Sequence, residues 1–153
     1  MQLSAAGLEL IKKSEGFRAR LYLDVAGFTT IGYGHRLTPS DSFPDGIDEA
    51  QAVALLEGDV RQAEQAVGKL VRVTLSQGQF DALVDFCFNM GAGRLAGSTL
   101  LRELNAGRCN DAGDQLLYWV YAGGVPNAGL KARRQAEFQL WTRGELDKAA
   151  PAA

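Results

Sequence analysis

The sequence is short of the residues from which metal centres and disulfide scaffolds are built. Its 153 residues include a single histidine, His35, and two cysteines, Cys87 and Cys109. Because a structural zinc site takes four Cys or His ligands, these three residues cannot complete one within a single chain. Two cysteines do not make a disulfide framework for a chain of this length either. We therefore expect free thiols, no metal site and no cofactor.

Long apolar runs and an excess of positive charge are also missing. No stretch approaches the roughly 18 apolar residues of a membrane span, and the N-terminus lacks the basic start and apolar run of a secretory signal. With 16 basic and 18 acidic residues the net charge is −2, so no global positive field attracts nucleic acid. The sequence predicts a soluble cytoplasmic protein that binds no nucleic acid and does not insert stably into membranes.

The sequence does contain enough apolar material for one folded domain over residues 1–153. Hydrophobic residues make up 46% of the chain and charged residues 22%, a composition that excludes general disorder. Since histidine and cysteine are so few, carboxylates are the most plentiful groups that could serve in catalysis.

The apolar pattern changes period within the first third of the chain. Ser4 is a suitable N-cap for a helix over residues 4–14. From Phe17 onward apolar and polar residues alternate, and turns rich in glycine and aspartate separate the runs. This alternation predicts a small lobe with a β-hairpin or sheet over residues 15–46.

The remainder has helical periodicity. Apolar residues recur at helical spacing over residues 47–72, behind Asp48 as N-cap with a glutamine in capping-box position. Residues 73–148 contain further apolar helical segments. We predict an α+β, lysozyme-like architecture in which the long helix joins the small lobe to this larger helical lobe. The helix over residues 4–14 is expected to pack on the larger lobe, and a cleft between the lobes would hold an extended ligand.

Within the larger lobe, Ser76 is placed to cap a helix with a broad apolar face. Three shorter helices are expected over residues 98–106, 111–121 and 130–142. The glycine-rich segment over residues 122–129 is expected to be a loop between the last two helices.

Three polar residues around the first hairpin are candidates for acid–base catalysis. Glu15 follows the first helix, where the negative end of the helix dipole favours a protonated acid. Asp24 falls in the hairpin turn, where we expect an ionised carboxylate, and Thr30 offers a hydroxyl in the return strand. Two carboxyl groups in divergent environments are typical of an acid and base pair. Such residues are also common without any function, so these features alone leave both interpretations open.

The spacing of these residues closely resembles that of the phage-type lysozymes, glycoside hydrolase family 24, which include the T-even phage lysozyme and its endolysin relatives. That family has Glu, eight residues, Asp, five residues, Thr and then Ile-Gly-x-Gly-His. Here Glu15, Asp24, Thr30 and His35 stand at the corresponding positions. The resemblance continues in order through segments that begin at Ile47, Gln79, Ser98 and Gly129. It therefore covers nearly the whole chain.

The resemblance implies a muramidase that hydrolyses the β-1,4 bond between N-acetylmuramic acid and N-acetylglucosamine in bacterial peptidoglycan. Glu15 would be the general acid on the glycosidic oxygen. Asp24 and Thr30 would position a water on the opposite face of the sugar, which gives inversion. By family analogy the protein would lyse the host cell and reach the wall through a holin-made membrane lesion. We expect a monomer.

The same resemblance makes His35 a structural residue. The acidic position of the long helix that it matches is Asp59, so we predict an ion pair between His35 and Asp59. Such a pair would raise the pKa of His35 and stabilise the fold at low pH.

Four further residues are candidates for substrate binding: Gly34, Phe88, Asn89 and Arg133. Phe88 and Asn89 match cleft-lining positions of the family, although Phe88 suits a plain core position equally well. Gly34 would allow a sugar to approach the backbone, or would merely relieve crowding in the strand. Arg133 belongs to a basic stretch with Lys131, Arg134 and Arg143, which we interpret either as a patch for the acidic stem peptide or as a solvated helix face.

Other activities stay open at this point. A lytic transglycosylase cleaves the same bond with a glutamate alone, whereas the presence of Asp24 and Thr30 favours hydrolysis. A chitinase-like enzyme and a lysozyme-fold protein that binds wall glycan without cleaving it are further alternatives. A peptidase or amidase would use Cys87 and His35, but Cys87 lies in an apolar stretch where a thiol is inert.

Overall fold

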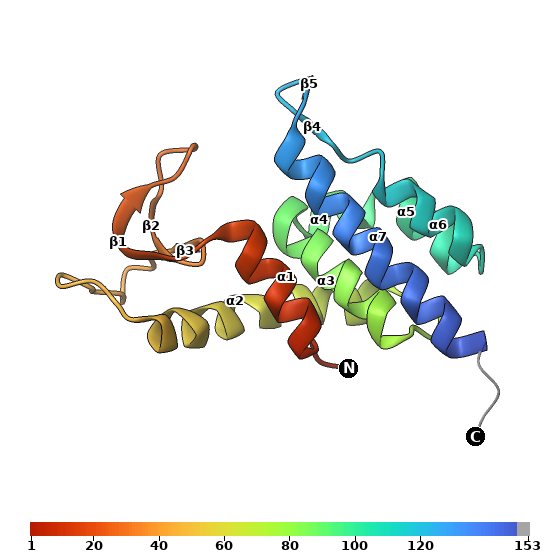
Figure 1. Cartoon of the computed structure of the whole chain (residues 1–153), viewed down its shortest axis with the longest axis horizontal. Coiled ribbons are helices and arrows are strands. Elements are labelled where there is room, and N and C mark those ends of the chain that lie inside the picture. The colour runs from red at the N-terminus through yellow and green to blue at the C-terminus, as the bar shows by residue number, and fades with distance from the viewer. Residues whose placement is uncertain (150–153) are drawn as a thin grey trace. The chain divides into compact units, whose positions relative to one another are not determined.

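The computed structural model describes residues 1–149 and has a mixed α+β fold (Figure 1), which confirms the predicted class. The chain divides into two compact units. One consists of residues 11–62, and the other consists of residues 1–10 together with the chain from residue 63 onward. Helices α1 (Ala5–Glu15) and α2 (Glu49–Leu70) each contribute residues to both units.

The unit of residues 11–62 contains a small antiparallel sheet in the order β1-β2-β3. Its strands are β1 (Arg18–Leu23), β2 (Thr29–Gly32) and β3 (His35–Arg36). The central strand is the buried one, whereas most side chains of β1 are exposed. Residue Thr30 of β2 pairs with Tyr22 on one side and with Arg36 on the other.

Local signals in the sequence set the start of α2. The side chain of Asp48 accepts a hydrogen bond from the Gln51 backbone at 2.8 Å, and the Gln51 side chain accepts one from the Asp48 backbone at 2.9 Å. This reciprocal pair is the predicted capping box. The apolar face of the helix then contributes Leu56 and Val60 to a core that also buries Ile31 of β2.

The second unit is built mainly of helices. After α2 its elements are α3 (Gln77–Met90), α4 (Ala92–Ala96), α5 (Thr99–Asn105), α6 (Cys109–Leu116), β4 (Tyr121–Ala122), β5 (Val125–Pro126) and α7 (Ala128–Ala149). Helix α3 packs along α7, and α5 packs against α6 (Figure 1). None of the described helices combines the length and apolar character that crossing a bilayer demands.

Capping and burial explain the position of α3 and α7. Ser76 caps α3 as predicted, and it forms a full capping box with Gln79. Phe86 of α3 and Trp141 of α7 are almost completely buried, and the Trp141 indole donates a hydrogen bond to the Cys109 carbonyl at 3.1 Å. The indole nitrogen is thereby satisfied inside an apolar core, as buried tryptophans require.

Two expectations about this unit are wrong in their boundaries. The helix expected over residues 111–121 ends at Leu116, and the segment expected as a loop contains the β4–β5 hairpin. Gly123 and Gly124 both have positive φ, +58° and +78°, the conformation that a tight two-residue hairpin turn requires. Helix α7 begins earlier than expected because the Asn127 side chain caps it, accepting from the Leu130 backbone at 2.9 Å.

Candidate active site

Glu15 is the last residue of α1, and contacts within residues 11–62 anchor this end of the helix. One turn earlier, the Lys12 ammonium lies 3.4 Å from Glu49 Oε1 and 5.7 Å from the ring centroid of Tyr33. The Tyr33 hydroxyl donates to the same Glu49 oxygen at 3.1 Å, and its ring centroid lies 5.6 Å from that of Phe17. The turn of α1 that carries Glu15 is therefore tied to the start of α2 and to the segment between β2 and β3.

The carboxylate of Glu15 lies close to Gly34. A Cβ atom at Gly34 would lie 3.1 Å from Glu15 Oε2, and Gly34 has a φ of +76°. Both the left-handed backbone and the nearby carboxylate favour glycine at this position. The structure thus brings Gly34 next to Glu15. A role for Gly34 in binding substrate stays a prediction.

Asp24 lies in the turn between β1 and β2, where three donors hold its carboxylate. Its Oδ1 accepts from the backbone N–H groups of Ala26 and Phe28, both at 2.9 Å, and its Oδ2 accepts from Arg36 Nε at 2.9 Å. The hydrogen bond from the Phe28 backbone has the largest effect and lowers the pKa of Asp24. The Ala26 backbone and Arg36 lower this pKa further, whereas partial burial raises it. Asp24 is therefore ionised at neutral pH, as the sequence indicated.

Thr30 is buried in β2 and shares a partner with Asp24. Its hydroxyl donates to the Phe28 carbonyl at 2.8 Å. The same carbonyl accepts the Asp24 backbone N–H at 2.9 Å. Because the hydroxyl proton is used on Phe28, the oxygen lone pairs of Thr30 remain to accept a hydrogen bond from water. The structure therefore brings Asp24 and Thr30 together on one hairpin.

Arg36 belongs to this group of residues, although the sequence gave no reason to single it out. Its signal is topological, because β3 places Arg36 opposite Thr30 in the ladder and its side chain reaches Asp24. Its guanidinium carbon lies 4.2 Å from the ring centroid of Phe28. A register of this kind is not visible before the strands are paired.

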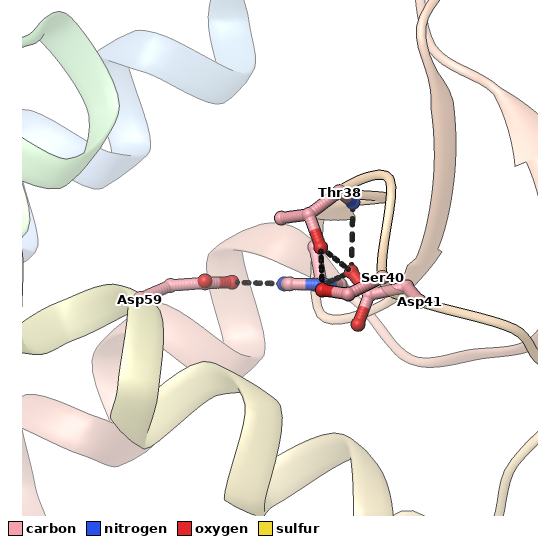
Figure 2. Close-up of polar contacts among 5 residues, drawn as sticks. Thr38, Ser40, Asp41 and Asp59 are labelled. Atoms are coloured by element: carbon pink, nitrogen blue, oxygen red, sulfur yellow. Dashed lines mark hydrogen bonds and ion pairs between the residues drawn. The ribbon is translucent and has the colours of Figure 1, made fainter.

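The imidazole of His35 lies between two carboxylates. Its Nδ1 is 2.8 Å from Asp59 Oδ2 and its Nε2 is 2.9 Å from Asp41 Oδ2. Figure 2 shows Asp59 at one end of this chain of contacts and Asp41 at the other, with Thr38 beside Asp41. The structure thus brings His35 and Asp59 together and adds Asp41. Both ring nitrogens can donate only when the imidazole is protonated, so the arrangement suits the imidazolium.

The electrostatics of these residues follow from burial and partners. Burial by itself lowers the pKa of His35, but the hydrogen bonds and charges of Asp41 and Asp59 outweigh it and leave the pKa raised. The backbone N–H of Thr38, followed by His35, lowers the pKa of Asp41. Burial raises the pKa of Asp59 despite its contact with His35. Asp41 is therefore the carboxylate that stays ionised to lower pH.

Asn89 and Arg133 lie in a buried polar cluster on α3 and α7. Arg133 donates to both oxygens of Asp85, from Nη2 to Oδ1 at 2.7 Å and from Nε to Oδ2 at 3.0 Å. Arg134 donates to Asn89 Oδ1 at 2.6 Å, and its Nη2 lies 3.0 Å from Glu137 Oε1. Asp85, Arg134 and Glu137 have no exposed surface. We call these five residues the buried cluster.

The basic stretch on α7 forms neither the surface patch nor the solvated helix face that the sequence left open. Arg133 and Arg134 are buried, so only Lys131 and Arg143 of the four basic residues face solvent. In the interior, Asp85 contacts Arg133 and Glu137 contacts Arg134. Binding of substrate by Asn89 or Arg133 stays a prediction, as does a role for Phe88, which is half-buried.

The pKa of one carboxyl group in the buried cluster is strongly raised. Burial raises the pKa of Glu137 well above its ordinary value, and a hydrogen bond with Asp85 and the charge of Asp85 raise it further. The charge of Arg134, 3.0 Å from Glu137 Oε1, and that of Arg133 act in the opposite direction but do not outweigh burial. Asp85 contacts Arg133 directly. Arg134 gains support from the ring of Phe86, whose centroid lies 5.0 Å from the guanidinium carbon.

With this geometry in hand, comparison with known proteins decides the family. A family model described as phage lysozyme matches residues 12–137. The chain belongs to the phage lysozyme family.

Relatives and solved structures agree with this assignment to the phage lysozyme family. The endolysin of Bacillus phage B103 is 44% identical over 148 residues, which are 95% of this chain and 56% of that protein. The endolysin of Salmonella phage P22 is 40% identical over 138 residues, 88% of this chain and 94% of that protein. The solved muramidase domain of SpmX from Asticaccaulis excentricus has a TM-score of 0.83 at 38% identity and covers 92% of this chain and 97% of its own.

The match to the phage lysozyme family extends across the residues described above. Residues 12–137 contain Glu15 at the end of α1 and the hairpin with Asp24 and Thr30, and they end on Glu137 of the buried cluster. The chain spans 56% of the B103 endolysin but nearly all of the P22 endolysin. The predicted lysozyme-like fold is confirmed by the likeness to the solved muramidase domain.

The contacts of His35 predict a pH-dependent contribution to the stability of this phage lysozyme. Because the folded pKa of His35 is raised, its stabilisation is present at low pH and is lost as pH rises through that folded value. Asp59→Asn should lower the pKa of His35 and destabilise the fold by about 1–2 kcal/mol below this pKa, with a smaller effect above it. The single histidine gives one imidazole C2–H signal whose NMR titration measures the pKa directly.

Glu57→Gln is the matched control, since Glu57 is exposed on the same helix two residues away. It should leave both the titration and the stability unchanged. An Asp59→Asn protein with the parent's histidine titration and the parent's pH–stability curve would contradict the prediction.

The buried cluster predicts that its two acids differ in their importance for stability. Glu137→Gln keeps the size of the side chain and removes an acid whose pKa burial already raises, so the loss should be within about 1 kcal/mol. Asp85→Asn leaves the buried Arg133 guanidinium without its carboxylate and should lose about 3 kcal/mol or more. Urea unfolding at neutral pH measures both losses. Equal losses in the two variants would mean that Glu137 is charged in the folded protein.

Proposed function

We propose that this member of the phage lysozyme family is an inverting muramidase of glycoside hydrolase family 24. Its bond would be the β-1,4 linkage between N-acetylmuramic acid and N-acetylglucosamine in peptidoglycan. The chain belongs to the phage lysozyme family, and its match to the P22 endolysin spans nearly the full length of that protein. Both findings make it a glycoside hydrolase that degrades peptidoglycan. The inverting mechanism and the residue roles are our proposal.

In the proposed mechanism Glu15 donates a proton to the glycosidic oxygen as the bond breaks. Its support is the anchored helix end, which gives the acid a defined position against Gly34. General acids of this kind typically contribute 10²–10⁴-fold to a rate. The departing sugar leaves as an alcohol, and an oxocarbenium-like centre develops on the sugar ring that remains.

Asp24 and Thr30 would hold the attacking water on the opposite face of that sugar. The observation that carries this role is the shared anchor on Phe28, which fixes the Asp24 carboxylate and the Thr30 hydroxyl relative to each other. Because hydrogen bonding lowers the pKa of Asp24, it is a weak proton acceptor until charge develops. Its ionised carboxylate is suited to orient the water and to stabilise the positive sugar ring.

We further propose, by family analogy, that the enzyme acts as a monomer on the cell wall. It would wait in the cytoplasm of the host bacterium and reach the wall through a holin-made membrane lesion. The endolysin relatives support the wall as the place of action. A lytic transglycosylase is the alternative activity, and the chemical form of the products separates the two.

Digestion of purified peptidoglycan tests the proposed reaction. Mass analysis should show muropeptides that end in reducing N-acetylmuramic acid, and NMR of fresh products should show the α-anomer, as inversion requires. Glu15→Gln and Asp24→Asn should each lower the rate by about 100-fold or more without loss of folding. The exposed Glu57→Gln serves as the matched control. Anhydro-muramic products would instead establish a transglycosylase.

Gly34→Ala tests the position of Glu15. The added Cβ would lie 3.1 Å from Glu15 Oε2, so we expect the rate of wall digestion to fall about tenfold or more. Gly107→Ala is the control, because Gly107 has a φ of +83° and no neighbouring atom within 4 Å of the added Cβ. Both variants should lose about 1–2 kcal/mol of stability to backbone strain. Equal activity of the two variants would show that Gly34 does not act through Glu15.

A further inference from the structure

The side chain of Arg36 supports the proposed water-positioning residues from the neighbouring strand. Its Nε donates to Asp24 Oδ2 at 2.9 Å, and its backbone lies opposite Thr30 in the β2–β3 ladder. The side chain is 57% exposed, so the pair makes a small contribution to folding stability. Because the ion pair adds little to folding stability, its directed contact with Asp24 suggests a role in the function of that carboxylate.

We propose that Arg36 is a positioning residue for the hydrolytic water, acting by fixing the orientation of the Asp24 carboxylate. This inference rests on the proposed role of Asp24 in hydrolysis. It adds to the glutamate, aspartate and threonine of the family motif a residue that touches the aspartate and not the substrate.

The hydrogen-bond capacity of the carboxylate defines where the water binds. An ionised carboxylate has about four lone-pair sites, two on each oxygen. Among the described contacts, the N–H groups of Ala26 and Phe28 occupy both sites of Asp24 Oδ1, and Arg36 occupies one site of Oδ2. The remaining site is on Oδ2. Arg36 therefore determines which lone pair of Asp24 Oδ2 stays free to bind a water. In the proposed mechanism this water also contacts the Thr30 hydroxyl.

The guanidinium itself is held in place by two further features. Its carbon lies 4.2 Å from the ring centroid of Phe28, a distance at which a cation is attracted to the aromatic face. The ladder pairing ties its backbone to Thr30. Since Phe28 also bonds to Asp24 and Thr30 through its backbone, the arginine and both water-binding groups share one support. A lysine cannot reproduce the planar stacking or the directed Nε–H donor.

The test compares Arg36→Ala with Arg20→Ala, which removes the same charge from an exposed position on β1 of the same sheet. In Arg36→Ala we expect kcat to fall about tenfold with little change in KM. The acidic limb of the pH–rate profile should move about half a unit to higher pH, because the Asp24 carboxylate loses a cation. Arg20→Ala should change neither kcat nor the acidic limb of the pH–rate profile. Carbon-13 NMR titration of the Asp24 carboxyl group measures the same shift without relying on activity.

Arg36→Lys separates charge from geometry. Arg36→Lys should return the pKa of Asp24 most of the way to its value in the parent enzyme, but kcat should stay low. If the arginine had a purely structural role, lysine would restore both quantities or neither. Thermal melting of each variant checks that the hairpin is folded. An Arg36→Ala enzyme with the kcat and Asp24 titration of Arg20→Ala would overturn the inference.

Failure of the proposed function would look different. If Asp24→Asn retains full activity, Asp24 does not act in hydrolysis and the role of Arg36 falls with it, even though NMR still reports their contact. If Asp24→Asn is inactive and Arg36→Ala is normal, the proposed function stands and only the role of Arg36 is wrong.

Discussion

The backbone of Phe28 is the support on which the polar groups of the hairpin depend. Its N–H fixes one oxygen of Asp24, and its carbonyl accepts both the Asp24 backbone and the Thr30 hydroxyl. A backbone donor cannot rotate away as a side chain can, so the carboxylate is held in the orientation that the turn dictates. Its ring also supports Arg36. Substitution at this position would change the side-chain contacts and leave the backbone contacts, which separates the two kinds of support.

The two units of the chain satisfy charge in different ways. Around the hairpin, Asp24 is partly exposed, so its ion pair adds little stability and the carboxylate stays ionised for chemistry. In the buried cluster Asp85 is fully enclosed, and removing one partner would leave an uncompensated charge in the interior. Burial there also raises the pKa of Glu137 well above its ordinary value, whereas backbone hydrogen bonds lower that of Asp24. Burial and local donors thus shift the carboxyl groups of the two units in opposite directions.

Local signals were visible in the sequence, and contacts that depend on tertiary structure were not. The capping boxes at Asp48 and Ser76 involve residues three apart, so propensity alone located the starts of α2 and α3. The spacing from Glu15 to Thr30 indicated the family because the number of residues between these positions is set by the length of the hairpin. Helical periodicity could not show that Arg133 faces Asp85, since a charged residue on a helix is normally exposed and its buried partner lies 48 positions away. The contact of Arg36 with Asp24 depends on strand register in the same way.

These placements change the meaning of the net charge. The formal value of −2 counts Glu137 as an anion, although burial raises the pKa of this carboxyl group well above its ordinary value. Burial of Arg133 and Arg134 removes two cations from the surface, while Arg18 and Arg20 stay exposed on β1. Screening limits charge effects to about 8 Å at physiological salt, so each exposed arginine acts only on its own surroundings. The net charge of the chain is therefore a poor guide to the field at the hairpin, which depends on the charges that lie beside it.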